Sequence, residues 1–250
     1  MGFVLWIQKF FIVDLILIII TLSVALSIRY SSLDTNAPLI ILPSDPVSVA
    51  YESISYTIIC ITNFVIGPFV ILFFYMSVRF DYKIFDLLYS YFFAITLTML
   101  VTSIVGKSIR RPKPDTLSLC QGDGSILACS QYLSKSQIVQ QFNSFPSYHT
   151  AEIMASAVFI SLLFHYMTKS FSLLGAIFMV FPILFAIFVA VTRICDRQAD
   201  ISDVVAGMFI GGMMAVICFK NFKKSMKIMS QAEKRKLTIE QSASTVPRYV

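Results

Sequence analysis

Residues 143–150 read NSFPSYHT, and they lead directly into an apolar run that extends to about residue 167. The chain has only two histidines among its 250 residues, and one of them, His149, stands at the mouth of this run. The first residues of a helix carry backbone N–H groups without partners inside the helix, and these groups attract anions. His149 at such a helix start therefore predicts a polar site at one end of a hydrophobic segment.

The composition is typical of a protein that crosses a membrane several times. Hydrophobic residues make up 57% and charged residues 14% of the chain, and the mean hydropathy is +0.77, which excludes an ordinary soluble domain. A membrane-spanning helix takes about 20 apolar residues. Six runs meet or approach that length, so we expect an all-α bundle of six transmembrane helices. They lie at about 10–28, 53–77, 84–105, 150–167, 171–192 and 201–219.

Two of these runs contain helix-breaking residues, Gly67-Pro68 in the second and Pro182 in the fifth, which neighbouring helices in a membrane tolerate. The first run is interpreted as a retained helix, because it is too long for a signal-peptide core and has no cleavage site nearby. Asp14 within it is interpreted as an interfacial carboxylate rather than a proton relay.

The distribution of charge predicts the orientation. Residues 220–250 hold eight basic and two acidic residues, whereas the rest of the chain holds twelve of each. The positive-inside rule places this tail in the cytoplasm, and six spans return the N-terminus to the same side. We expect three parts: a first transmembrane helix and outer loop (1–52), a helical core (53–219) and a basic cytoplasmic tail (220–250).

The loop 30–52 supports this orientation, because it lacks Lys and Arg but carries Asp34, Asp45 and Glu52. The tail is either a basic helix that lies on an anionic cytoplasmic membrane leaflet or only the positively charged segment that ends the last span. The protein is expected in the plasma membrane or an endomembrane.

Three polar segments then share the outer side: GKSIRRPKPD (106–115), FPSYHT (145–150) and TRICDRQADISD (192–203). Guanidinium groups match phosphate oxygens with paired hydrogen bonds, and a helix N-terminus adds backbone donors. His149 is placed to pass a proton to a leaving oxygen. Together the segments predict a cradle for a phosphoryl group. Its cations are Lys107, Arg110, Arg111, Lys113 and Arg193.

The order and spacing of these segments resemble the type 2 phosphatidic acid phosphatase (lipid phosphate phosphatase) superfamily, which shares its fold with vanadium haloperoxidases. The family pattern is Lys, six residues, Arg-Pro; then Pro-Ser-Gly-His; then Ser-Arg, five residues, His, three residues, Asp. Eukaryotic members often read Gly-Arg-Pro-Arg-Pro-Asp in the first segment, and here RRPKPD leads into TLSLCQGDG in a close parallel. The resemblance covers residues from about 50 to 219.

The resemblance implies a mechanism without metal or cofactor. The histidine of the third segment attacks phosphorus, an aspartate orients it, and the histidine of the second segment protonates the leaving alkoxide. The implied ligands are phospholipid or isoprenoid phosphate monoesters, phosphatidic acid among them, and no nucleic acid is expected. Mapped onto this chain, the catalytic positions are His149 and Asp203. The implied phosphate-binding residues are Lys107, Arg111, Lys113, Ser147, Tyr148 and Arg193.

The chain departs from the pattern most at the nucleophile position, which follows Arg193 after five intervening residues and is occupied by Ala199 in place of the family histidine. Removing such a nucleophile lowers the rate about a millionfold. The main hypothesis is therefore a family member that binds a lipid phosphate with its catalysis impaired. The alternative is an active phosphatase with a substituted nucleophile, for which Asp200 and Cys195 are the candidates.

The other two segments depart as well. Tyr148 replaces the family glycine, and its ring either narrows or covers the anion pocket. Aligning Lys113-Pro114 with Arg-Pro puts Gly106 at the family Lys, whereas aligning Arg111-Pro112 puts Ile104 there.

The remaining features leave several questions open. Cys120 and Cys129 share the outer loop, and the sequence does not decide whether they form a disulfide.

No metal site is expected, because Cys and His residues do not cluster at ligand spacing. Gly207, Gly211 and Gly212 in the last span predict close helix packing. Membrane lipids are the expected partners, with homo- or hetero-oligomers of family members left open.

Overall fold

The computed structural model describes residues 2–33, 51–78, 84–120, 124–167 and 173–244, and Asp34 and Asp45 of the predicted outer loop lie outside these ranges. The described residues contain helices and no strand. Six of the described helical segments are long and apolar enough to cross a membrane, which confirms the predicted all-α, six-span bundle. They are Ile12–Tyr30, Tyr56–Met76, Ile84–Ile109, Tyr148–Met167, Gly175–Cys195 and Ile201–Lys227.

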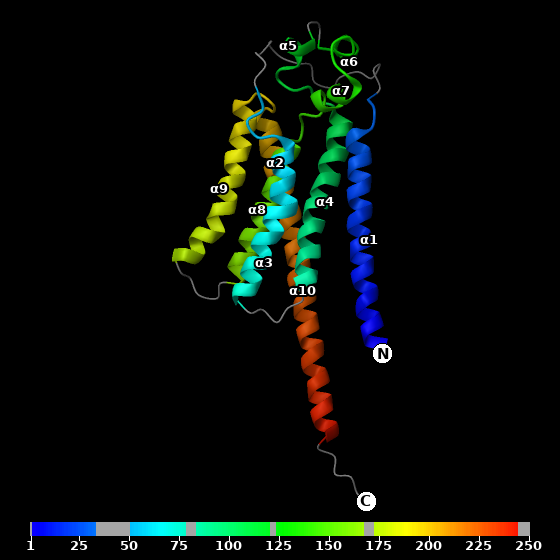
Figure 1. The fold of residues 1–250 in the computed structure, drawn as a ribbon, viewed down its shortest axis with the longest axis vertical. Helices are drawn as coiled ribbons and strands as arrows, with labels where there is room; N and C mark the ends of the chain where they lie inside the picture. The colour runs from blue at the N-terminus through cyan, green and yellow to red at the C-terminus, as the bar shows by residue number, and fades with distance from the viewer. Residues whose placement is uncertain (1, 34–50, 79–83, 121–123, 168–172, 245–250) are drawn as a thin grey trace, which may run out of the picture.

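The long helices run side by side, and three short helices cap one end of the bundle (Figure 1). We call this the capped end. In chain order the elements are α1 (Gly2–Tyr30), α2 (Tyr56–Ile61), η1 (Thr62–Ile66), α3 (Gly67–Val78), α4 (Ile84–Ile109), α5 (Thr116–Cys120), α6 (Ile126–Cys129), α7 (Lys135–Gln141), α8 (Tyr148–Met167), α9 (Leu173–Cys195) and α10 (Ile201–Ser244).

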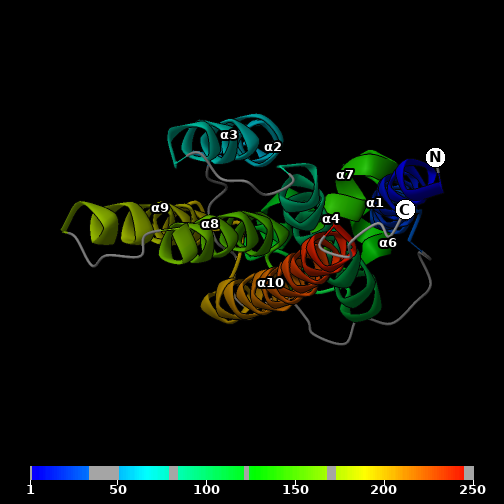
Figure 2. The same ribbon diagram turned by 90° about the horizontal axis from the view of Figure 1, so that it is seen from below.

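Helix α8 is the centre of the bundle. In its most apolar stretch 72% of the residues are buried, whereas α1 buries only 11% of the corresponding stretch. Helix α8 packs against α4, α9 and α10, and Figure 2 shows it surrounded by these helices and by the α2–α3 span. The start of α8, which carries His149, is therefore held by its neighbours on several sides.

The second span passes through Gly67-Pro68 without a break, because a π-helical turn, η1, precedes it. Proline has no N–H to donate, and π-helical turns are one way in which a helix absorbs such a defect. The hydroxyl of Tyr91 donates to the backbone carbonyl of Asn63 (2.9 Å) and also pairs with Ser156 Oγ (2.7 Å). A Cβ atom at Gly67 would overlap with that hydroxyl, so glycine admits the tyrosine that satisfies this polar backbone.

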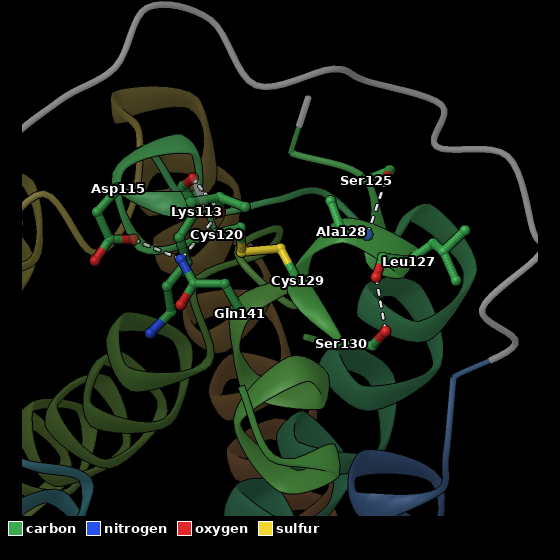
Figure 3. Close-up of a disulfide and its surroundings, with 10 residues drawn as sticks. Lys113, Asp115, Cys120, Ser125, Leu127, Ala128, Cys129, Ser130 and Gln141 are labelled. Atoms are coloured by element: carbon green, nitrogen blue, oxygen red, sulfur yellow. Dashed lines mark hydrogen bonds between the residues drawn. A yellow bond between two sulfur atoms is a disulfide. The ribbon is translucent and has the colours of Figure 1, made fainter. Parts of the chain in front are cut away.

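The cap is stabilised by a disulfide between Cys120 and Cys129, the pairing that the sequence left open (Figure 3). Ile126, Ile138 and Phe142 pack around it as a small apolar core. Helices α5, α6 and α7 therefore have a core of their own above the long helices, with both sulfur atoms buried.

Helix α10 continues without interruption past residue 219 to Ser244, and Figure 1 shows its last part extending beyond the other helices. Phe222 and Met226 are still buried after the predicted boundary, and Lys223 lies over the ring of Tyr166 at 5.1 Å. The basic segment thus begins as a direct extension of the last span.

Two glycines bring α10 into close contact with the start of α8. A Cβ atom at Gly207 would lie 2.5 Å from the carbonyl oxygen of Ser147, and one at Gly211 would overlap with the carbonyl of Ala151. Small residues allow such backbone approach between helices in membranes, where the hydrophobic effect does not drive helices together. The contact fixes the N-terminus of α8 against α10.

We expect Gly211→Ala to destabilise the protein by about 1–3 kcal/mol, because the new methyl group overlaps with backbone that cannot move aside alone. Gly212→Ala is the matched control, since its Cβ would lie 3.9 Å from Val158 Cγ2, an ordinary contact. Alanine is favoured over glycine inside a helix by about 0.5–1 kcal/mol, so the control should unfold at the same temperature or higher. The measurement is the midpoint of thermal unfolding in detergent, and equal shifts for both variants would contradict the packing argument.

Candidate functional site

The end of α9 and the start of α10 are joined at the capped end by a tight turn over residues 196–200. The carbonyl oxygen of Arg193 accepts hydrogen bonds from the N–H groups of Gln198 (3.0 Å) and Ala199 (3.3 Å), which closes α9. Arg197 reverses the chain in the left-handed region, with φ of 56°. The turn leaves the side chain of Arg193 directed into the bundle, where 2% of the residue is exposed.

Arg193 and His149 converge on one carboxylate oxygen. Arg193 Nη1 donates to Glu52 Oε1, and His149 Nε2 lies 3.1 Å from the same oxygen. The second contact is within ion-pair distance but lacks the angles of a hydrogen bond, so Nε2 remains without a hydrogen-bond partner among the described residues. Two family positions from different helices, α8 and α9, thus reach a single anionic atom.

Glu52 carries that negative charge at neutral pH. Partial burial alone would raise its pKa, but His149 and Arg193 outweigh burial and lower the pKa of Glu52 to about 2. Glu52 is therefore an ionised carboxylate whose Oε1 lies against Arg193 Nη1 and His149 Nε2.

Lys113 adds a second cation beside this pair. Its Nζ donates to Gln198 Oε1 at 2.6 Å. Burial, reinforced by nearby Arg193, lowers the pKa of Lys113 to about 8, although Asp115 and Glu52 act in the opposite direction. We call Glu52, Lys113, His149 and Arg193 the Glu52 cluster.

A cavity of about 90 Å³ adjoins the Glu52 cluster. Glu52 and Lys113 form part of its wall, so the carboxylate faces both the buried cations and open space. The remaining lining residues are Arg29, Tyr30, Tyr56, Val139, Gln140, Asn143 and Tyr148.

Below the cluster lies a buried ion pair between Arg29 of α1 and Glu152 of α8. Arg29 Nη2 donates to Glu152 Oε1 at 2.8 Å, and the two side chains are 5% and 0% exposed. Tyr56 joins them, because its hydroxyl accepts from Arg29 Nη1 (2.7 Å) and donates to Glu152 Oε2 (3.0 Å). A charge at this depth is stable only when it is paired and hydrogen-bonded, and both conditions are met here.

The ring of Tyr148 is directed toward this ion pair. The guanidinium carbon of Arg29 lies 4.6 Å from the Tyr148 ring centroid, within the range of a cation–π contact. The same ring lies 4.4 Å from the imidazole of His149 and 5.3 Å from the ring of Tyr56, measured between centroids. Tyr148 therefore contacts both Arg29 of the buried ion pair and His149 of the Glu52 cluster.

Asp203 is fully buried and is surrounded by donors other than an imidazole. Arg111 Nη1 donates to its Oδ1 at 2.6 Å, and Ser144 Oγ donates to its Oδ2 at 2.5 Å. The N–H of Asp200 also donates to Oδ2 (3.1 Å), and the Asp200 side chain pairs with Arg111. Ala199 packs with Ala190 and Val204 nearby, in an apolar cluster.

The remaining predicted residues lie at the same end of the bundle but engage other partners. Lys107 donates to the backbone carbonyl of Ser31 at the end of α1. Ser147 Oγ pairs with Thr150 Oγ1 (3.0 Å), and the N–H of Ser147 donates to the carbonyl of Asp203 (3.0 Å). The structure thus brings Lys113, His149 and Arg193 together, and it directs Lys107, Arg111 and Ser147 elsewhere.

Gly106, which one of the two alignments places at the family lysine, lies against Asn143. A Cβ atom at Gly106 would overlap with Asn143 Oδ1, and the carbonyl of Phe145 would lie 3.3 Å away. A lysine side chain at this position would displace Asn143 from the wall of the cavity.

Arg29 and Glu152 were not predicted from the sequence as site residues, and Glu52 was predicted only as a charge on the outer side. The sequence contains part of the information needed to predict Glu152. It is a single carboxylate within the apolar run 150–167, and a carboxylate in a membrane-spanning helix usually pairs with another charged group. The sequence does not reveal that the partner is Arg29 on α1, because that contact depends on how α1 packs against the bundle.

Comparison with protein families and curated proteins identifies similar sequences. A family model described as PAP2 superfamily matches residues 87–227, more than half of the chain. Lipid phosphate phosphatase 1 of Arabidopsis thaliana is 29% identical over 141 residues, which cover 52% of this chain and 42% of that protein. Lipid phosphate phosphatase 2 of the same plant is 27% identical over 171 residues, covering 63% and 58%.

An animal protein is similar to the same degree. Phospholipid phosphatase 2 of Rattus norvegicus is 28% identical over 154 residues, covering 57% of this chain and 56% of that protein. This chain spans about half the length of the curated relatives it matches. No solved structure matches it.

The buried ion pair allows a test of the site's framework. Arg29→Met should destabilise the protein by about 3–5 kcal/mol, because it leaves Glu152 buried without a counter-charge. Adding Glu152→Gln to that variant should recover much of the loss, since neither charge then remains. Thermal unfolding in detergent measures both effects, with Lys227→Met, which removes one exposed charge from α10, as the control. A loss for Arg29→Met no larger than the control's would contradict the pairing.

Proposed function

This chain belongs to the PAP2 superfamily, and from that premise we propose that it recognises phosphatidic acid or a related lipid phosphate monoester with its catalysis impaired. In this proposal the capped end faces the extracytoplasmic side and both termini lie in the cytoplasm. The named relatives are lipid phosphate and phospholipid phosphatases, which supports a phosphorylated lipid as the ligand class.

One observation carries the proposal: Arg193 and His149 reach the same oxygen of a carboxylate. Two donors that meet at one anionic atom can hold a phosphoryl oxygen in the same way. Arg193 Nε is buried without a hydrogen-bond partner among the described residues, so the guanidinium retains a donor for a second oxygen. Lys113, which lines the adjoining cavity, would add a further positive charge.

The proposed impairment rests on the surroundings of Asp203 and Ala199. Asp203 already accepts from Arg111 and Ser144, and Ala199 has no group that could attack phosphorus. The second histidine of the chain, His165, lies sixteen residues after His149 on α8, about 24 Å along the helix. It therefore cannot replace the missing imidazole.

We expect the purified chain to release no more phosphate from short-chain phosphatidic acid than its Arg193→Ala variant. Ala199→His should raise release at least about tenfold above that background, a small part of the millionfold that a complete nucleophilic site provides. Full recovery is not expected, because Arg111 and Ser144 compete for the aspartate that would orient the new imidazole. Phosphate release is measured colorimetrically, with Ala199→His/Arg193→Ala as the control. Arg193-dependent release by the unchanged chain would contradict the proposed impairment.

Anion binding should weaken as the pH rises through about 8. Lys113 has a lowered pKa, so it is charged below that pH and loses its charge above it. Tungstate is a suitable probe, because it remains a dianion between about pH 7 and 10, and calorimetry reports its affinity. Binding by Lys113→Arg should stay constant over this range, because a guanidinium keeps its proton. An equal loss of affinity in that variant would exclude Lys113 as the cause.

A further inference from the structure

We propose that Glu52 is an internal competitor of the ligand: its carboxylate occupies the position of one phosphoryl oxygen between Arg193 and His149, and a bound phosphate must displace it. This inference rests on the proposed function, because it concerns the same site. It adds that the chain carries its own anion for the cradle, and that this anion sets the affinity for lipid phosphates.

The first support is the shared contact. Glu52 Oε1 is the acceptor for Arg193 Nη1 and lies 3.1 Å from His149 Nε2. A phosphoryl oxygen that used both nitrogen atoms would have to take this same position. The carboxylate and a phosphate cannot occupy it together, because both are negative and both need the same donors.

The second support is that Glu52 is presented to the cradle from outside. Its side chain is 35% exposed, whereas those of Arg193 and His149 are each 2% exposed. The carboxylate therefore has a path toward solvent that the two buried groups lack. A ligand could replace it without rearranging α8 or α9.

The third support is a pair of hydrogen bonds from Ser53, the residue after Glu52, to Asp196, which we call the clamp. The N–H and the hydroxyl of Ser53 donate to the two carboxylate oxygens of Asp196, each at 2.7 Å. Asp196 follows Arg193 by three residues at the end of α9, so one helix end supplies both the cation and the clamp. The clamp keeps Glu52 beside Arg193 when no ligand is bound.

The charges of the site explain why Glu52 lies beside Arg193 and why a phosphate displaces it. A buried arginine without a counter-charge is strongly unfavourable, so the empty cradle is more stable with Glu52 in place. Protonation does not release Glu52 at neutral pH, since the pKa of its carboxyl is about 2 in the presence of His149 and Arg193. The groups that face it are His149 on α8, Arg193 on α9 and Lys113 before α5. A doubly charged phosphate monoester attracts these groups more strongly than one carboxylate does.

A purely structural counter-ion would behave differently from a competitor. If Glu52 only neutralised Arg193, its removal would destabilise the protein and leave anion affinity unchanged or lower. If Glu52 competes, its removal also destabilises the empty protein, but anions then bind more tightly and restore stability. Affinity therefore separates the two roles where stability alone does not.

The experiment measures binding to the full chain in detergent by calorimetry, with tungstate and dihexanoyl phosphatidic acid as separate probes. Glu52→Gln should bind both probes at least about tenfold more tightly than the unchanged chain, within the usual range of coupling between sites. Asp196→Asn weakens the clamp but leaves the Glu52 carboxylate in place, so it should give a smaller gain in affinity. Asp14→Asn removes a carboxylate from a separate cavity between α1, α4 and α10, and should leave affinity unchanged.

The outcomes distinguish the two proposals. Equal or weaker binding by Glu52→Gln, with binding by the unchanged chain still dependent on Arg193, would overturn the inference and leave the proposed function standing. No binding of either probe by the unchanged chain and by Glu52→Gln would overturn both. Tighter binding of tungstate but not of the lipid would support the competitor and assign the site to free phosphate. If Glu52→Gln does not fold, Glu52→Asp keeps the charge on a shorter side chain, and the same gain in affinity is expected at a smaller size.

Discussion

The structure depends on the neutralisation of charges that are buried at one end of a membrane bundle. Three of the arginines at this end each pair with a carboxylate from a different part of the chain: Arg29 with Glu152, Arg193 with Glu52, and the partly exposed Arg111 with Asp203. The first pair joins α1 to α8, the second joins the segment before α2 to α9, and the third joins the segment after α4 to α10. Because an unpaired charge at such depth is strongly unfavourable, these pairs also fix how the helix ends meet.

Close packing brings the paired groups within reach. Gly207 and Gly211 let α10 approach the backbone of α8, so that the N–H of Ser147 reaches the carbonyl of Asp203 at 3.0 Å. In a membrane the attraction between helices comes from such fitted contacts rather than from exclusion of water. A wider separation of α8 and α10 would break this hydrogen bond, which lies two residues before His149. The polar site and the glycine contact are therefore two aspects of one packing arrangement.

The sequence predicts the fold well because the length of an apolar run is a direct physical requirement of the bilayer. It also predicts that His149 and Arg193 lie at one end, since both stand at the ends of predicted spans. It does not predict that Tyr148 turns toward Arg29, or that Lys107 turns toward Ser31, because side-chain direction at a helix end depends on the neighbouring helices. The role of Glu52 was hidden for the same reason: a glutamate in an outer loop has no periodic pattern that indicates its partner.

The departures from the family pattern are matched by changes around them. Gly106, one of the two residues that align with the family lysine, leaves room for Asn143, which lines the cavity beside the Glu52 cluster. Ala199, at the position where the sequence pattern predicts the nucleophile, packs in an apolar cluster, while the carboxylate of Asp203 accepts hydrogen bonds from Arg111 and Ser144. A site that had only lost one residue would retain an unsatisfied aspartate and an open position, and neither is found among the described residues. In these surroundings, Glu52 serves as the anion beside Arg193. An arrangement with buried nitrogen groups at Arg193 and His149, and with the Asp203 carboxylate already hydrogen-bonded, is the reason why we propose binding rather than turnover.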